Sequence, residues 1–252
     1  MKWLLLRGLV RETRHWGSFP DFFEKQLRAF DETAEVFTLD FPGFGSEAAK
    51  LSPATVSGIV DDLRARWTQL APNEKWNFFA VSLGGMVALN WVSRYPKDFE
   101  KLVLVNSSLR DLSPFHHRLR PQNYAQILGI FFNADVASRE EIVLSITTNL
   151  KNHEIKNLAK TYAGFAVPTR RRDAIAQLYA AAIFKAPSRI PIPILILASE
   201  KDQLVSAKCS TQIAERFGSP IYYHSDANHD LPIDAPEWVT EKVLAWAHSA
   251  AD

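Results

Sequence analysis

The sequence has 252 residues, 47% of them hydrophobic, and a formal net charge of +1 at pH 7. A chain of this size can bury the core of one domain, and we expect no second one. The near-neutral charge gives no general attraction to nucleic acid or membrane surfaces, so we expect neither as a partner. The single cysteine, Cys209, cannot form an intramolecular disulfide, which favours a reducing compartment and predicts a cytoplasmic location.

The first apolar run predicts a strand and not a targeting segment. Trp3 to Leu6 is shorter than the roughly 7 apolar residues of a signal peptide, and Arg7 ends it. Gly8 then allows the backbone to turn. No later segment approaches the ~18 uncharged apolar residues of a membrane span.

Strand patterns alternate with helix patterns in the rest of the chain. The expected strands are Val36 to Asp40, Trp76 to Val81, Leu102 to Asn106, Ile192 to Ala198 and Pro220 to His224, and the expected helices include Thr55 to Leu70 and Met86 to Arg94. This alternation is typical of βαβ units in a parallel sheet. We interpret Ser52 and Asp234, each followed closely by a proline, as caps of the next helices.

Between Leu109 and about Arg189 the pattern becomes helical and polar, without buried strand runs. We interpret residues 109–189 as a helical lid inserted into a core formed by residues 1–108 and 190–252. Apolar lid side chains, with Phe115 and Tyr124 among them, are candidates to line an acyl pocket, although most of them are explained by packing onto the core.

Two basic clusters mark the lid. His116, His117, Arg118 and Arg120 form one, and Arg170 to Arg172 form the other. Such clusters are usually solvated, but Arg118 and Arg120 are also candidates to bind an acidic or carrier-linked acyl donor. Adjacent histidines do not share a helix face and have no third ligand at suitable spacing, so we predict no metal site.

Ser82 is the candidate nucleophile. It lies in the segment Ala80 to Gly85, between an expected strand and an expected helix, with small residues on both sides. A serine at such a sharp turn presents its hydroxyl at the top of the sheet. A serine before two glycines is also an ordinary turn or helix cap, so the assignment depends on partners elsewhere.

Asp202 and His229 supply those partners. Each follows an expected strand, and the order Ser82, Asp202, His229 is that of α/β-hydrolase triads. The intervals leave room for several elements before the acid and for one helix and one strand before the base. Glu200 remains a competing acid. A buried structural histidine and a helix-capping aspartate are the alternatives without catalysis.

In these motifs, and over nearly its whole length, the chain resembles the α/β-hydrolase-fold serine hydrolases of the small esterase type. Leu39 to Ser46 is similar to their Asp-x-Pro-Gly-x-Gly loop, and Pro232 to Trp238 is similar to the segment after their histidine. Ser82 to Ala88 is also similar to carboxylesterases that cleave pimeloyl-carrier methyl esters. The resemblance implies an α/β fold with a mostly parallel central sheet flanked by helices, a helical lid and no cofactor.

The resemblance also assigns the oxyanion hole to the backbone amides of Leu9 and Leu83. Arg7 stands where the family usually has histidine, and it is either a tether to a neighbouring carboxylate or a substrate-binding cation. The implied activity is hydrolysis of a carboxylic ester or thioester through an acyl-enzyme. Carbon–carbon bond hydrolysis, perhydrolysis, and an inactive ligand-binding protein with the same fold are the alternatives.

Overall fold

The structure, a computed structural model, describes residues 1–71 and 74–249. Six strands form its central sheet: β1 (Lys2–Leu6), β2 (Glu35–Thr38), β3 (Trp76–Val81), β4 (Phe99–Val105), β5 (Ile194–Ser199) and β6 (Ile221–His224). Their order is β2-β1-β3-β4-β5-β6, and every pair is parallel. Each expected strand is present, with ends that differ by up to three residues.

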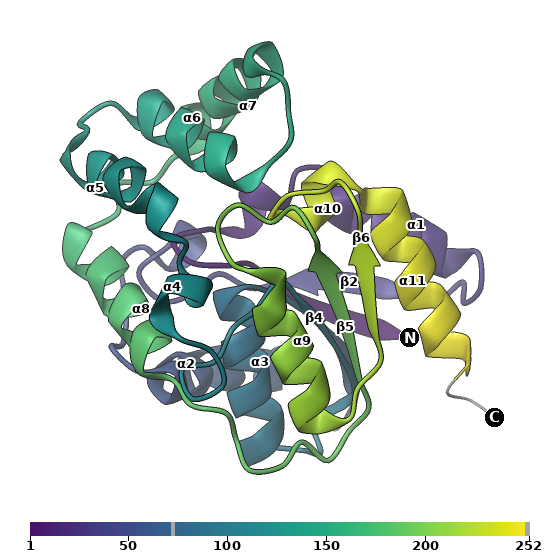
Figure 1. Cartoon of the computed structure of the whole chain (residues 1–252). Helices are drawn as coiled ribbons and strands as arrows, with labels where there is room; N and C mark the ends of the chain where they lie inside the picture. Colours follow the sequence, from purple (N-terminus) through teal and green to yellow (C-terminus); the bar gives the residue numbers. More distant parts are fainter. Residues whose placement is uncertain (72–73, 250–252) are drawn as a thin grey trace.

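Helices cover both faces of this sheet (Figure 1). α2 (Val56–Leu70), α3 (Leu83–Arg94) and α9 (Ala207–Phe217) pack on one face, whereas α1 (Phe19–Arg28) and α11 (Pro236–Ser249) pack on the other. The shorter elements are the helix α10 (Leu231–Asp234) and the 3-10 turns η1 (Thr13–Trp16), η2 (Gly45–Glu47) and η3 (Pro121–Asn123). This confirms the predicted α/β architecture.

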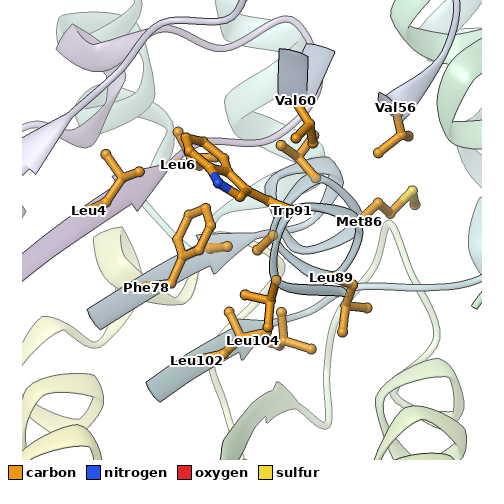
Figure 2. Packing of buried hydrophobic residues seen from close by; sticks show 14 of the residues in the cluster. Leu4, Leu6, Val56, Val60, Phe78, Met86, Leu89, Trp91, Leu102 and Leu104 are labelled. Carbon is orange, nitrogen blue, oxygen red and sulfur yellow. The ribbon is translucent and has the colours of Figure 1, made fainter. Parts of the chain in front are cut away.

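The strands are apolar on both sides because both faces are covered. Leu4 and Leu6 of β1 point into the core beneath α2 and α3, while Trp3 and Leu5 point into the core beneath α1 and α11. Figure 2 shows the first of these cores, where Trp91 of α3 packs against strand side chains. Burial of such side chains contributes about 1.5–3 kcal/mol each, and it fixes the sheet that carries the site.

All of the regular structure between β4 and β5 is helical, in a segment that is described throughout. It contains α4 (Phe115–Arg118), α5 (Tyr124–Phe132), α6 (Val136–Thr147), α7 (Asn152–Phe165) and α8 (Arg171–Ile183). In Figure 1, α5, α6 and α7 lie at the end of the molecule to which the β6 arrow points. Leu144 of α6 and Ile155, Ala159 and Tyr162 of α7 form a small separate core.

The two expected helix caps are wrong. Thr55, not Ser52, caps α2: its side chain accepts a hydrogen bond from the Gly58 amide. The Asp234 carboxylate accepts hydrogen bonds from the backbone amides of Asn149 and Asn228, which belong to other segments.

None of the helices within residues 1–71 and 74–249 has both the length and the apolar character needed to cross a membrane.

Candidate active site

Five polar residues follow strands at the carboxyl edge of the sheet. Arg7 follows β1, Ser82 follows β3, Asn106 follows β4, Asp202 comes after β5, and His229 comes after β6. Because these strands are neighbours in a parallel sheet, their carboxyl ends meet at one edge. Ligand sites of open parallel sheets lie at this edge.

The turn at Ser82 has strained backbone geometry. Ser82 has φ 56° and ψ −117°, a conformation that side-chain-bearing residues rarely adopt. Strain of this kind costs about 1–3 kcal/mol and is typical of functional turns. A Cβ on Gly84 would lie 2.6 Å from the Leu6 carbonyl oxygen, and one on Gly8 would lie 3.1 Å from Ser82 Cβ. The turn therefore closes only because neighbouring positions lack side chains.

Hydrogen bonds hold this turn in place. The Ser82 amide donates to the Val105 carbonyl at 2.9 Å, which joins the turn to β4. The Ser82 carbonyl accepts from the Gly85 amide at 2.9 Å and from Ser107 Oγ at 2.8 Å. Ser107 is 2% exposed, so its hydroxyl has few competing partners. The Ser82 side chain itself is half-buried.

The structure brings Asp202 and His229 together. His229 Nδ1 donates to Asp202 Oδ2 at 2.7 Å, and Asp202 Oδ1 accepts from the Leu204 and Val205 amides at 2.8 Å each. Asp202 and His229 are both buried. Glu200, the competing acid, is exposed. No hydrogen bond of the Ser82 hydroxyl occurs within the described residues, so its pairing with His229 remains a proposal.

A buried amide network, missed at the sequence level, supports the histidine loop. Asn106 Nδ2 donates to the His229 carbonyl at 2.8 Å and to Ser199 Oγ at 3.0 Å. Ser199 Oγ in turn donates to the Asn228 carbonyl at 2.6 Å, and Asn228 Oδ1 accepts from the His229 amide at 2.8 Å. These bonds tie the loops after β4 and β6 to the last residue of β5.

Arg7 has a carboxylate partner. Its two terminal nitrogens donate to both oxygens of Asp230, at 2.8 and 2.5 Å, and each side chain is about 5% exposed. The guanidinium also lies 4.7 Å from the centre of the Trp16 ring. The tether that the sequence offered as one alternative is therefore present, and the positive charge of Arg7 is balanced.

Helix α8 holds the loop that follows β1, which contains the predicted oxyanion donor Leu9. Val10 has φ 56°, and its amide donates to Gln177 Oε1 at 2.9 Å. No hydrogen bond within the described residues uses the Leu9 amide. Leu83 is the first residue of α3, where backbone amides have no intrahelical acceptor. Both predicted oxyanion donors thus have no hydrogen-bond partner among residues 1–71 and 74–249.

The remaining candidates lie in the helical segment between β4 and β5. Arg118 donates to the carbonyls of Ala181 and Ala182 at the end of α8, and Arg120 Nη1 donates to the Asp202 carbonyl at 2.6 Å. Both arginines thus bind backbone carbonyl groups. Phe115 and Tyr124 are exposed, with ring centres 6.2 Å apart.

The His229 environment favours its charged form. Burial lowers the pKa of the imidazole, but the Asp202 carboxylate outweighs burial, so the pKa of His229 lies above its usual value of 6.5. A general base must be neutral to accept a proton.

We therefore expect kcat/KM for p-nitrophenyl acetate to fall as the pH drops through the raised His229 pKa, with a midpoint above pH 6.5. A pH-rate profile measures this midpoint. A profile that stays flat down to about pH 5 would exclude His229 as the base.

The parallel sheet, the strained serine turn and the buried His–Asp pair are the features of the α/β-hydrolase fold. A family model described as serine aminopeptidase, S33 matches residues 14–235, so the chain belongs to that family. The protein is a hydrolase, as the sequence resemblance predicted.

Relatives of known name span most of the chain. It is 27% identical over 242 residues to "Putative carbamate hydrolase RutD" of Caulobacter sp. (strain K31), covering 90% of this chain and 86% of the relative. A thermophilic esterase from Thermogutta terrifontis is 18% identical with a TM-score of 0.72, covering 99% and 90% of the two chains. The enol-lactonase from Burkholderia xenovorans LB400 is 17% identical with a TM-score of 0.76, covering 98% and 91%. The two structures support the fold assignment.

Proposed function

We propose that the protein is a serine hydrolase that cleaves a carboxylic ester or thioester through a covalent acyl-enzyme. The observation that carries this proposal is the 2.7 Å hydrogen bond between His229 Nδ1 and Asp202 Oδ2, at the sheet edge that also carries the strained Ser82 turn. A buried histidine that is oriented by a carboxylate, at the same sheet edge as a serine turn, supports the activation of the serine hydroxyl.

In the proposed mechanism, Ser82 Oγ attacks the acyl carbonyl while His229 Nε2 accepts the hydroxyl proton. Asp202 holds the imidazole in the required tautomer and stabilises its charged form. The amides of Leu9 and Leu83 donate to the oxyanion of the tetrahedral intermediate. His229 then returns the proton to the departing alcohol or thiol, and a water molecule cleaves the acyl-enzyme by the same steps.

A carbamate ester is a second candidate substrate. It is favoured by the similarity to the carbamate hydrolase, which spans 90% of this chain. The same acyl transfer would cleave it. Aminopeptidase activity, which the family description names, needs a carboxylate to bind the substrate ammonium group. Asp230 is paired with Arg7, and Glu140 is paired with Arg11, so neither carboxylate is free to bind an ammonium group. We therefore expect no aminopeptidase activity.

An acidic or carrier-linked acyl donor remains part of the proposal, as does a cytoplasmic location. Because Arg118 and Arg120 donate to backbone carbonyls, we now assign the recognition of negative charge to Arg171 and Arg172. These two side chains are exposed at the start of α8.

Replacing both Arg171 and Arg172 by neutral residues should raise KM for an acidic acyl donor and leave KM for a neutral ester unchanged. The difference should be smaller at high salt, because salt screens the attraction.

A matched substrate panel tests the proposed function. We expect turnover of p-nitrophenyl acetate and the corresponding thioester, with weaker turnover of an aryl carbamate and none of an amino-acid p-nitroanilide. The p-nitroanilide reports aminopeptidase activity directly. If the protein cleaves only the p-nitroanilide, its function is that of an aminopeptidase and not of an ester hydrolase. If it cleaves none of these substrates, the result favours a ligand-binding protein without activity.

A further inference from the structure

The Arg7–Asp230 ion pair joins two parts of the proposed catalytic machinery. Arg7 immediately precedes the loop that contains the Leu9 oxyanion donor, and Asp230 immediately follows His229. The two residues are 223 positions apart in sequence, yet their side chains form a bidentate contact at 2.8 and 2.5 Å. A bidentate guanidinium–carboxylate contact fixes orientation as well as distance.

The surroundings leave this pair little freedom. The ring centre of Trp16 lies 4.7 Å from the Arg7 guanidinium, and the Asp230 amide donates to the Thr147 carbonyl of α6 at 2.8 Å. Both side chains are excluded from solvent, so screening by water and salt is weak. The pair therefore holds the His229 loop at a fixed distance from the oxyanion loop.

The same pair affects the charge around the imidazole. Asp202 and Asp230 favour the charged form of His229, whereas Arg7 opposes it. The charged and titratable groups that surround the ion pair are Arg11, His15, Glu140, Tyr162 and Asp234, and burial raises the pKa of Asp234 to about 6. Arg11 is itself paired with Glu140 at 2.5 Å, so it adds little net charge.

We propose that Arg7 and Asp230 form a positioning pair, which aligns His229 with the oxyanion loop and balances the charge next to the imidazole. This inference rests on the proposed function. Neither residue contacts substrate in the proposed mechanism. They act through the placement and the protonation of His229.

Removing one partner at a time should shift the pH-rate profile in opposite directions. Asp230→Asn leaves the Arg7 cation unbalanced near His229, so the acid-limb midpoint of kcat/KM should fall by about one pH unit. Arg7→Gln leaves the Asp230 carboxylate unbalanced, so the midpoint should rise by a similar amount. A purely structural role would lower the amount of active enzyme without moving either midpoint.

Two further variants separate charge from alignment. The double variant Arg7→Gln, Asp230→Asn restores the charge balance, so its midpoint should return towards the wild-type value while kcat stays about tenfold lower, because the tether is weaker. Arg7→Lys keeps the charge but lacks the bidentate geometry. It should also keep the wild-type midpoint with a lower kcat and an unchanged KM. If Arg7→Gln fails to fold, Arg7→Lys and Asp230→Asn still provide the test.

The matched control is Asp98→Asn, which breaks the ion pair of Asp98 with Arg64 next to Trp91 in the other core. It should lower the melting temperature without moving the midpoint. Midpoints that stay at the wild-type value in Asp230→Asn and Arg7→Gln, or that move in the same direction, would overturn the role of the pair. A wild-type protein without ester turnover would instead overturn the proposed function, and this inference with it.

Discussion

Ser82→Ala should lower kcat for p-nitrophenyl acetate by about 10⁶-fold, which is the scale seen when serine hydrolases lose their nucleophile. The hydroxyl is the group that forms the acyl-enzyme in the proposed mechanism, and no other serine occupies a strained turn at the sheet edge within the described residues. The melting temperature should change little, because the backbone conformation at position 82 is held by the hydrogen bonds of its own amide and carbonyl.

Ser145→Ala is the matched control for this loss. Ser145 is exposed on α6, and its hydroxyl donates to a carbonyl of its own helix. It should keep wild-type turnover. Retention of more than about a tenth of the wild-type kcat in Ser82→Ala would mean that another group carries the reaction.

Asp202→Asn should lower kcat by about 10⁴-fold. The carboxylate accepts from His229 Nδ1, which leaves Nε2 free to accept the serine proton. An asparagine presents an amide nitrogen there and favours the wrong tautomer. The two Oδ1 contacts with backbone amides persist in the variant, so the loop should remain folded.

The combination with His229→Ala gives a second check on the acid. In the proposed mechanism Ser82, Asp202 and His229 act as one unit, so adding Asp202→Asn to His229→Ala should cause almost no further loss. Glu200→Gln is the control, since Glu200 is exposed. Steady-state kinetics of Asp202→Asn, His229→Ala, the double variant and Glu200→Gln identify the acid. A silent Asp202→Asn together with a crippling Glu200→Gln would reverse the assignment of the acid.

The sequence was sufficient for the parts of the molecule that depend on local patterns. Buried strands read as continuous apolar runs because both sheet faces are covered, so the strand Trp76–Val81 was predicted with its observed bounds. Asp202 and His229 were selected because each follows an expected strand and because they stand in the order of α/β-hydrolase triads. Their pairing in space then agreed with their order in the chain.

Contacts between segments that are distant in the chain could not be predicted from the sequence. Arg7 was a candidate tether without an identified partner, because nothing near it in the chain indicates Asp230. Ser52 and Thr55 both have a side-chain oxygen and both lie close to the start of α2, and only the backbone geometry decides for Thr55. The role of Asn106 was not predicted because it depends on the Ser199 hydroxyl and the His229 carbonyl, which belong to distant segments of the chain.

The contacts of Arg118 and Arg120 could not be predicted from the sequence either. A cluster of basic residues predicts either a solvated surface or an anion site, and a third role, the binding of backbone carbonyls, has no sequence signal. Arg118 donates hydrogen bonds to carbonyl groups in the last turn of α8, and Arg120 donates a hydrogen bond to the Asp202 carbonyl. We infer that Arg120 attaches the 109–189 segment to the core, whereas Arg118 joins α4 to α8 within that segment.

Covalent labelling with a fluorophosphonate tests the central claim most directly. The reagent should add one adduct to the wild-type protein by intact mass, peptide mapping should place it on Ser82, and Ser82→Ala should remain unmodified. Cys209 is fully buried, and burial raises the pKa of its thiol, so it should not react. An adduct on any other residue, or no adduct on a folded protein that hydrolyses esters, would contradict Ser82 as the nucleophile.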